Sequence, residues 1–426
     1  MLYATLVVLL WVAACSALTG RFMQVTDFHI DPHYTAGTDP GTWCHRKNSK
    51  DGGKNIAGKF GTLSSKCDAP PALVEASFDF MKKHLQDVDF ILYTGDSVRH
   101  DRDKDNVPRT ENEVIDGQKT IIQYFGQTYN LRSTPCIPAI GNNDVYDNNV
   151  VVMDDQQYGT IESIWKPLGL NLTNSFRTGG YFVQQLSAHL RVVSMNTMLL
   201  LRKNKKLSDC EEPGQPGSIH LEWFKHELED ARTANDKVYV IAHVPPNGKT
   251  DKVFYKPSCY TKYMDILSSY GDVILGHFAG HFNNDQLTVV TDHSKHMPAL
   301  ATDRPHVEGK VQTVLFNAPS ILPLNNPAIR IYEYETKGDR YPIGTIRDWY
   351  QYYANLEEAN KSGRLDFQLE YQASKTYGVD HFDAAGINEV FQKLGNDQSV
   401  FDRYKTYLTV SKVLDKSELG NDDDDE

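Results

Sequence analysis

The stretch RFMQVTDFHI, residues 21–30, decides the fold of this chain. It begins as a short apolar strand and ends in the polar pair Asp27 and His29. Further along the chain, other short apolar runs stop in the same way at polar residues: Asp96, Asn142, His243 and His281. Because sites in open α/β sheets lie beyond the carboxyl ends of the strands, the sequence predicts that these side chains gather at one edge of the fold.

Helical segments separate several of these strands. Apolar residues recur at helical spacing in four stretches: 71–85, 113–129, 220–235 and 258–269. Residues 181–196 are interpreted as a strand hairpin, and residues 312–334 as further strands. We expect a catalytic domain over 21–345 and a mainly helical C-terminal subdomain over 346–415. The acidic residues 416–426 are expected to form a disordered tail.

The size and charge of the chain restrict its function. Its 426 residues suffice for one large catalytic domain and a smaller appendage. The formal net charge of −12 argues against nucleic acid as a partner, since general nucleic-acid binding needs a broad basic surface. A polyanionic substrate remains compatible with this charge, because a local basic groove can exist on an acidic protein.

The N-terminus carries a targeting signal over residues 1–17. The run from Leu2 to Ala17 is almost wholly apolar and ends in small residues suited to signal-peptidase cleavage. We interpret it as a signal peptide, with an uncleaved single membrane anchor or a buried core helix as the alternatives. Either of the first two directs the chain to the secretory route. Two sequons, at Asn171 and Asn360, are candidate glycosylation sites there.

The cysteines fit an oxidising compartment. Cys15 lies inside the apolar N-terminal run, which leaves five of the six cysteines for the folded part. Sequence alone leaves their connectivity open. Cys44 and Cys67 bracket a loop rich in Gly and Lys and are interpreted as one disulfide pair. We interpret Cys210 and Cys259 as the second pair, and Cys136, at the entry to a buried strand, as the unpaired thiol.

The polar residues at the strand ends have the composition of a two-metal site. Such a hydrolase needs a carboxylate between two ions about 3.5–4 Å apart, with imidazole and amide ligands around them. The order Asp-x-His, Gly-Asp, Gly-Asn, His and Gly-His along this chain resembles that of the calcineurin-like metallophosphoesterases. The resemblance implies a four-layer α/β fold with two packed mixed β-sheets flanked by helices and a small, mainly helical C-terminal appendage.

The same resemblance implies the role of each ligand. Metal one would bind Asp27, His29 and Asp96, and Asp96 would bridge to metal two. Metal two would also bind three further residues: Asn142, His243 and His281. The identity of the two divalent ions stays open among Zn, Mn, Fe, Co and Mg.

Two positions depart from the pattern of the wider family. Where that family has His after Gly-Asn, this chain has Asn143, followed by Asp144. Where the family has a second His after Gly-His, this chain has Asn283, which can still ligate metal one through its amide oxygen. Loss of the His at position 143 is best tolerated if the leaving group is already a stabilised anion, as in a phosphoanhydride, although His100 could supply a proton instead. The expected catalytic residues are Asp96, His100, Asn143 and Asp144.

Longer stretches resemble one subfamily, the vacuolar endopolyphosphatases of fungi in the acid-sphingomyelinase-like branch. These stretches include QVTDFHIDPHY at 24–34, TGDSVRHD at 94–101, GNND at 141–144, HVPP at 243–246 and GHFN at 280–283. The resemblance implies hydrolysis of internal phosphoanhydride bonds of inorganic polyphosphate by a hydroxide that bridges two metals. It also implies a location in the vacuole lumen or membrane, with an extracellular location as the alternative.

Basic residues near the site would hold the phosphates that flank the cleaved bond. The expected substrate-binding residues are Arg99, His100, Arg102 and Lys249. Arg109 and the basic run 202–206 are further candidates, although that run could equally be a flexible loop. Two other functions compete with this interpretation: a phosphodiesterase acting on a nucleotide or phosphocholine-type substrate, and a catalytically weak metal- or polyphosphate-binding protein.

Overall fold

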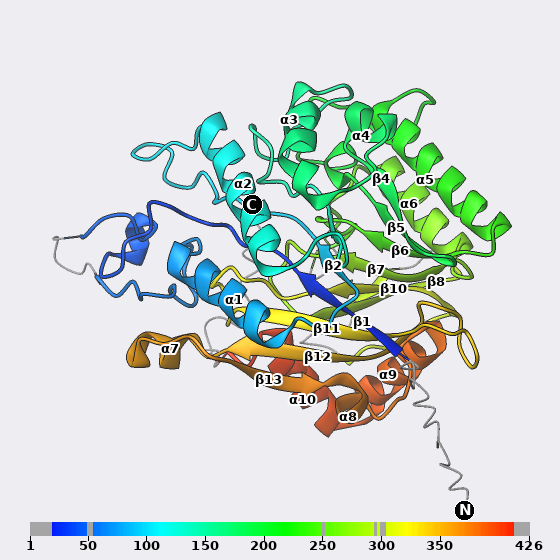
Figure 1. The fold of residues 1–426 in the computed structure, drawn as a ribbon. Helices are drawn as coiled ribbons and strands as arrows, with labels where there is room; N and C mark the ends of the chain where they lie inside the picture. The colour runs from blue at the N-terminus through cyan, green and yellow to red at the C-terminus, as the bar shows by residue number, and fades with distance from the viewer. Residues whose placement is uncertain (1–18, 49–53, 249–251, 294–295, 299–303, 413–426) are drawn as a thin grey trace, which may run out of the picture.

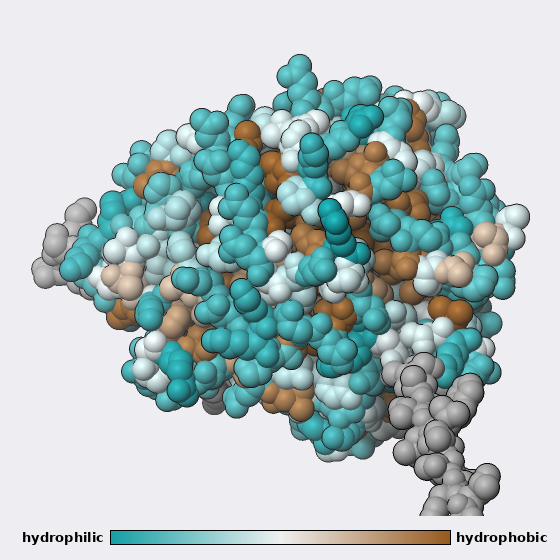
Figure 2. Space-filling model, in the orientation of Figure 1, coloured by the Kyte–Doolittle hydropathy of each residue, from teal (hydrophilic) through white to brown (hydrophobic). Residues whose placement is uncertain are grey.

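The computed structural model describes residues 19–48, 54–248, 252–293, 296–298 and 304–412. The predicted signal at 1–17, the acidic tail at 416–426 and Lys249 lie outside these residues. Within the described part, no helix is long and apolar enough to cross a membrane. On the face shown in Figure 2, hydrophilic side chains cover most of the surface and apolar groups reach it in separate patches.

The motif at 21–30 begins in strand β1, which belongs to the first sheet. The strands lie in the order β13-β12-β11-β1-β2-β3, with β1 parallel to β2 and β2 parallel to β3. Their bounds are β1 Thr19–Val25, β2 Phe90–Tyr93, β3 Cys136–Pro138, β11 Ala328–Glu335, β12 Ile346–Ala354 and β13 Phe367–Gln372. Because β1, β2 and β3 are parallel, the residues that follow them meet at one edge, as predicted.

The second sheet has the order β4-β5-β6-β7-β10-β8-β9. Its strands are β4 Phe182–Ser187, β5 Leu190–Ser194, β6 Lys237–Ile241, β7 Ile274–Ala279, β8 Gln286–Thr291, β9 His296–Pro298 and β10 Val311–Asn317. Strands β5, β6, β7 and β10 are parallel, and β4 and β8 pair antiparallel with their neighbours. The parallel strands β6 and β7 therefore also deliver the residues that follow them to a common edge.

The two sheets pack face to face through aromatic rings. Phe22 of β1 stacks on Phe90 and Tyr332 within its own sheet at ring-centroid distances of 4.8 and 4.7 Å. Across the interface it meets Tyr239 of β6 and Phe278 of β7 at 5.4 and 5.5 Å. Such buried, offset or edge-on aromatic contacts combine apolar burial with a preferred geometry, so they align the two sheets.

Helices cover the sheets and complete the predicted four-layer α/β fold (Figure 1). Helix α1 buries Leu73, Phe78 and Met81, and the Phe78 ring stacks on Phe28 at 5.1 Å just beyond β1. Helix α2 begins where the Thr110 side chain accepts a hydrogen bond from the Glu113 N–H. The bounds are α1 Pro71–His84, α2 Glu111–Thr128, α3 Gln156–Trp165, α4 Asn174–Gly179, α5 Pro216–Thr233 and α6 Pro257–Ser269.

The C-terminal segment differs from its prediction in one respect. It contains the expected helices α7 Leu356–Ser362, α8 Ala373–Tyr377, α9 Ala384–Asn396 and α10 Gln398–Leu408. It also supplies β12 and β13, which extend the first sheet by antiparallel pairing with β11. The predicted boundary at 345/346 therefore separates two paired strands of one sheet. Trp349 of β12 is fully buried, and its indole N–H donates to the Tyr371 hydroxyl at 2.8 Å.

Both predicted disulfides are confirmed. Cys44 is bonded to Cys67 and Cys210 to Cys259, and Cys136 is a buried free thiol.

The two candidate glycosylation sites differ in accessibility. Asn171 is exposed, whereas Asn360 is half-buried, accepts a hydrogen bond from Phe60 and donates one to the Gly61 carbonyl at 3.0 Å. The geometry therefore leaves Asn171 as the accessible sequon.

Candidate metal centre

Asp27 and His29 lie directly after β1 in an unusual backbone conformation. Their φ angles are 53° and 42°, in the left-handed region that non-glycine residues rarely adopt. The Asp27 and His29 N–H groups donate to the carbonyls of Gly95 and Asp96 at 2.9 and 3.1 Å. These bonds join the loop after β1 to the loop after β2. Strain of this kind persists only where the surrounding structure holds it, and it occurs often at functional sites.

Asp96 is placed by the carboxylate of Asp144. The Asp144 oxygens accept hydrogen bonds from the backbone N–H groups of Asp96, Ser97 and Gly141 at 2.9, 2.8 and 2.9 Å. Burial and the neighbouring Asp96 raise the pKa of Asp144. Asp144, predicted to be catalytic, thus joins the loop after β2 to the loop after β3 and holds Asp96 in position.

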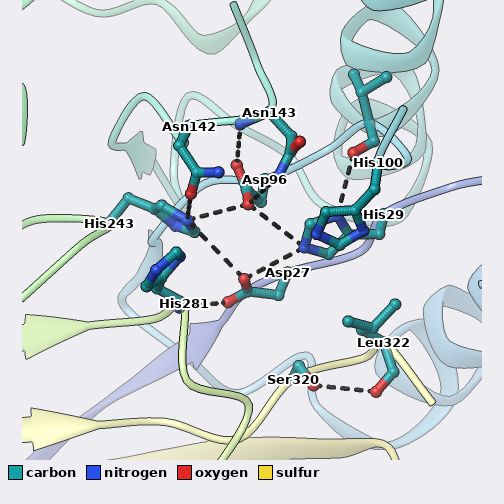
Figure 3. A network of polar contacts seen from close by, with 12 residues as sticks. Asp27, His29, Asp96, His100, Asn142, Asn143, His243, His281, Ser320 and Leu322 are labelled. Carbon is teal, nitrogen blue, oxygen red and sulfur yellow. Dashed lines mark hydrogen bonds and ion pairs between the residues drawn. The ribbon is translucent and has the colours of Figure 1, made fainter. Parts of the chain in front are cut away.

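The second sheet brings two imidazoles to the same place. His243 follows β6 and His281 follows β7, and the Gly280 N–H donates to the His243 carbonyl at 3.1 Å. The His281 N–H donates to Oδ2 of Asp27 at 3.0 Å, which ties the two sheets together at the site. His243 Nε2 lies 2.9 Å from Asn142 Oδ1 and 3.0 Å from Asp96 Oδ2 (Figure 3).

The donor set fits two cations that share one carboxylate. Ligand atoms of Asp27, His29 and Asp96 lie within 4.8 Å of one another, as do those of Asp96, His243 and His281. Asp96 belongs to both groups, and its Oδ2 lies 3.3 Å from His29 Nε2 and 3.0 Å from His243 Nε2. Asp96 therefore lies where a two-metal centre would need a bridging carboxylate.

Backbone carbonyls orient both metal-facing imidazoles. His29 Nδ1 lies 3.1 Å from the Val98 carbonyl, and His243 Nδ1 lies 2.7 Å from the Thr94 carbonyl. A carbonyl oxygen only accepts, so Nδ1 must carry the hydrogen in each ring. In the neutral tautomer Nε2 then presents its lone pair toward Asp96, which is the orientation a metal ligand needs.

The ionisation of the side chains at the site also suits the binding of cations. Burial alone would lower the pKa of His243, but Asp96 and Asp27 beside it raise that pKa to about 9. Burial would likewise raise the pKa of Asp96, but His243 and His29 bring it well below its usual value. Buried carboxylates that stay ionised need positive charge close by, and divalent ions provide it.

Two glycines allow the loops to approach the carboxylates. A Cβ on Gly141 would lie 2.0 Å from Oδ1 of Asp96, and one on Gly280 would lie 2.6 Å from Oδ2 of Asp27. Neither contact is possible for real atoms. The Gly in each Gly-Asn and Gly-His pair is therefore required by the close packing of the site.

Asn143 and Asn283 have different surroundings. The Asn143 backbone N–H and side-chain amide donate to Oδ1 and Oδ2 of Asp96 at 2.8 and 3.0 Å. Asn283 has a φ of 62°, and its Oδ1 is buried without a hydrogen-bond partner among the residues that the structure describes. A buried amide oxygen left without a donor is costly unless another partner satisfies it, which fits the predicted role of Asn283 as a metal ligand.

Only some of the basic residues that were expected to bind the substrate lie at the site. The His100 ring stacks on His29 with centroids 4.2 Å apart, and its Nδ1 lies 2.6 Å from Asp68 Oδ1. Arg99 is buried and turned away: its guanidinium donates to Glu113 and to the His100 carbonyl. Arg102 donates to the Lys66 carbonyl at 3.0 Å, so it lies against the loop that carries Asp68.

The sequence analysis did not predict the roles that two residues have at the site. Asp68 binds His100 through both carboxylate oxygens: Oδ1 lies 2.6 Å from His100 Nδ1, and Oδ2 accepts a hydrogen bond from the His100 backbone N–H at 3.0 Å. Arg109 donates to the carbonyl and side-chain oxygens of Asn143 at 3.0 and 3.3 Å, so it supports Asn143. Neither lies in a strand-end motif, and no local pattern marks them. His277, four residues before His281, is buried in β7, where its Nε2 lies 2.6 Å from the Tyr263 hydroxyl.

Comparison with known families agrees with this geometry. The profile described as calcineurin-like phosphoesterase matches residues 20–282, which contain the whole series from Asp27 to His281. The chain belongs to this family. Calcineurin-like phosphoesterases use a dinuclear metal centre, which accords with the two ligand groups that share Asp96. A second profile, the acid sphingomyelin phosphodiesterase C-terminal region, matches residues 312–422.

The relatives of this metallophosphoesterase fall into two groups. An endopolyphosphatase of Cryptococcus neoformans is 34% identical over 301 residues, which cover 63% of this chain and 43% of that protein. The human acid sphingomyelinase-like phosphodiesterase 3b is 30% identical over 411 residues, which cover 92% of this chain and 83% of that protein. The human cyclic GMP-AMP phosphodiesterase SMPDL3A is also 30% identical, with coverage of 92% and 83%. The chain thus spans less than half of the fungal relative.

Proposed function

We propose that this protein hydrolyses internal phosphoanhydride bonds of inorganic polyphosphate with the help of two divalent cations. The observation that carries the proposal is the environment of Asn143. Both of its N–H donors are directed at Asp96, and the position has no group that can give up a proton at neutral pH. The proposed ligands are Asp27, His29, Asp96, Asn142, His243, His281 and Asn283.

Each part of the chain would have a defined task in this reaction. When bound, the cations would activate a water molecule and neutralise charge on the phosphoryl oxygens. Asp96 would hold both cations, while Asn143 and Asp144 hold Asp96. His100, fixed by Asp68 beside His29, would contact the substrate and is the group placed to hold or donate a proton.

The leaving group connects Asn143 to the substrate. A phosphoanhydride releases a phosphate anion that is already stabilised, so it leaves with little help from an acid. An alkoxide released from a simple ester needs a proton much more. A site with an amide at position 143 therefore suits a chain of phosphates better than an alkyl ester. The similarity to endopolyphosphatases over 63% of the chain supports the same substrate class.

The second candidate is a phosphodiesterase that acts on a nucleotide or phosphocholine-type substrate. One specific observation favours it: the acid sphingomyelinase-like phosphodiesterases align over 92% of this chain, including the C-terminal region. His100 could supply the proton that such a substrate needs. A catalytically weak binding protein is the third and least supported candidate, because the Asp and His residues of the proposed ligand set lie close enough together to hold two cations.

One experiment separates these candidates. Purified protein is analysed for bound metals and incubated with long-chain polyphosphate, with a cyclic dinucleotide and with nitrophenyl-phosphocholine. We expect about two ions per chain and progressive shortening of the polyphosphate on a gel. Turnover of either diester without shortening of polyphosphate would replace the proposal by the second candidate. Two bound ions without turnover of any of the three would support the binding protein.

The proposed location is the secretory route, with the vacuole as its endpoint. Two disulfides tie together segments separated by 23 and 49 residues, and such bonds persist in oxidising compartments. Localisation of a tagged full-length chain would test this. A cytosolic signal in intact cells would contradict it.

A further inference from the structure

The basic run at 202–206, hereafter the cationic turn, carries four cations in five residues: Arg202, Lys203, Lys205 and Lys206. All four side chains are exposed, whereas the central Asn204 is fully buried. The whole chain has a net charge of −12, so this concentration of positive charge contrasts with the rest of the protein. Local patches of this kind attract anions even on acidic proteins.

The cationic turn is held rigidly by its buried centre. The Asn204 amide donates to the carbonyls of Val151 and Met198 at 2.8 and 3.1 Å. The buried ammonium of Lys256 donates to the Asn204 carbonyl at 2.8 Å and also to the Leu201 carbonyl. These bonds make it a fixed turn instead of a flexible loop, so its lysines project from a defined place.

That place lies between two loops that carry proposed metal ligands. On one side, Val151 and Asp147 belong to the loop after Asn142, and Lys206 Nζ lies 3.7 Å from Asp147. The Asn149 N–H in the same loop donates to the Asn142 carbonyl at 3.1 Å. The cationic turn is therefore joined to the loop that follows Asn142, and residues 149–151 of that loop link the two hydrogen bonds.

On the other side, the cationic turn is connected to His281. The Arg202 N–H donates to the Phe254 carbonyl at 2.8 Å. The Phe254 ring packs edge-on against His281 with centroids 5.6 Å apart. Asn142 and His281 both belong to the proposed ligand set of metal two.

We propose that the cationic turn binds the phosphoryl groups of a polyphosphate chain where it leaves the metal centre on the Asn142 and His281 side. This inference rests on the proposed function, because it takes a chain of phosphates as the substrate. The exposed ion pair between Lys206 and Asp147 does not prevent this binding, because such surface pairs contribute little to stability and a phosphate can displace the carboxylate.

The proposal has a consequence for substrate choice. A long chain can reach the metal centre and the cationic turn at once, whereas a small ester contacts only the metal centre. The turn should therefore strengthen the binding of long chains and leave small substrates unaffected. Its contribution should also weaken as salt is added, because exposed charges are screened.

The test uses a triple variant, Lys203→Gln, Lys205→Gln and Lys206→Gln, which leaves Asn204 and Lys256 in place. A matched control, Lys82→Gln, Lys83→Gln and Lys375→Gln, removes the same charge from exposed positions on α1 and α8. The first readout is the Kd of long-chain polyphosphate for metal-depleted protein at two salt concentrations. The second readout is the KM of metal-loaded protein for polyphosphate and for a nitrophenyl phosphate ester.

We expect the triple variant to bind polyphosphate at least about tenfold more weakly than the control, with a smaller salt dependence. Its KM for the nitrophenyl ester should stay within about twofold of the wild-type value. An equal Kd for both variants would overturn the proposal, as would a wild-type protein that does not bind polyphosphate. Polyphosphate binding that depends on the turn, without cleavage, would refute the proposed function and retain the cationic turn as a binding surface.

Discussion

The side-chain amide of Asn143 donates a hydrogen bond to Oδ2 of Asp96 at 3.0 Å. The neighbouring backbone N–H donates to Oδ1 of the same carboxylate at 2.8 Å. Asn143 thus orients the carboxylate that both proposed metal sites share. A histidine at this position could take part in proton transfer, whereas the amide can only orient its partner.

The variant Asn143→Ala removes one of these two donors and keeps the backbone one. Hydrogen bonds to charged groups contribute about 1.5–3 kcal/mol, so we expect kcat/KM to fall by about 10- to 150-fold. The content of bound metal should remain near two per chain. Steady-state kinetics and elemental analysis of the same preparation measure both values. Unchanged kinetics would show that Asp96 needs no orientation by the amide.

The variant Asp96→Asn keeps the shape of the bridging residue and removes its charge. We expect loss of at least one ion per chain and a fall in activity of more than about 10³-fold, because the remaining ligands cannot hold both cations together. Elemental analysis and circular dichroism would separate loss of metal from loss of fold. A well-folded variant that retains two ions and its activity would contradict the shared role of Asp96.

The His100 side chain provides a test based on the leaving group. In the variant His100→Gln we expect kcat to fall about 10²-fold for an alkyl phosphodiester, which needs a proton, and only slightly for a nitrophenyl ester. The variant Asp68→Asn should show the same pattern with a smaller loss, because Asp68 acts through His100. An equal loss on both substrates would assign His100 to binding alone.

Because of Glu370 in β13, we expect the folding stability of the protein to change with pH. Burial, with a contribution from Asp285, raises the pKa of Glu370 to about 8, above its ordinary value of 4.5. The folded state therefore holds this proton more tightly than the unfolded state. Its contribution to stability is fully present below the unfolded pKa of 4.5 and is lost as pH rises through the folded pKa of about 8.

The variant Glu370→Gln keeps the acceptor for the Ser411 hydroxyl and cannot ionise. At pH 8 we expect it to be more stable than the wild type by on the order of 4 kcal/mol, with a flatter dependence between pH 5 and pH 8. Urea unfolding across this range measures the difference. The control Glu389→Gln, at an exposed position on α9, should leave the curve unchanged. Identical curves for the wild type and Glu370→Gln would contradict the buried protonated carboxyl.

The Cys210–Cys259 disulfide closes a segment with a sequence separation of 49. Chain-entropy arguments give such a bond about 4 kcal/mol of stabilisation, through its effect on the unfolded state. The double variant Cys210→Ser and Cys259→Ser should lose stability by about this amount in denaturant titrations. A loss well below 1 kcal/mol would show that the unfolded chain is already constrained there.

The strand-end motifs allowed the proposed ligand set to be predicted from sequence alone. Asp27, Asp96 and His281 each follow a short apolar strand, and parallel strands bring their ends to one edge. Both disulfide pairs were also predicted correctly. These features are local: a strand, the residue after it, or a loop bracketed by two cysteines is visible without knowledge of the rest of the chain.

Contacts between distant segments could be decided only by the tertiary structure. Asp68 meets His100 across 32 positions, and Arg109 meets Asn143 across 34. Arg99 was expected to bind the substrate, but Glu113 of α2 holds it in the interior. The basic run at 202–206 packs against the loop after Asn142 because buried Asn204 binds Val151, 53 positions away. The sequence by itself determined which residues could bind metals, and packing decided which neighbours orient them, because such contacts depend on how separate loops meet and not on any local pattern.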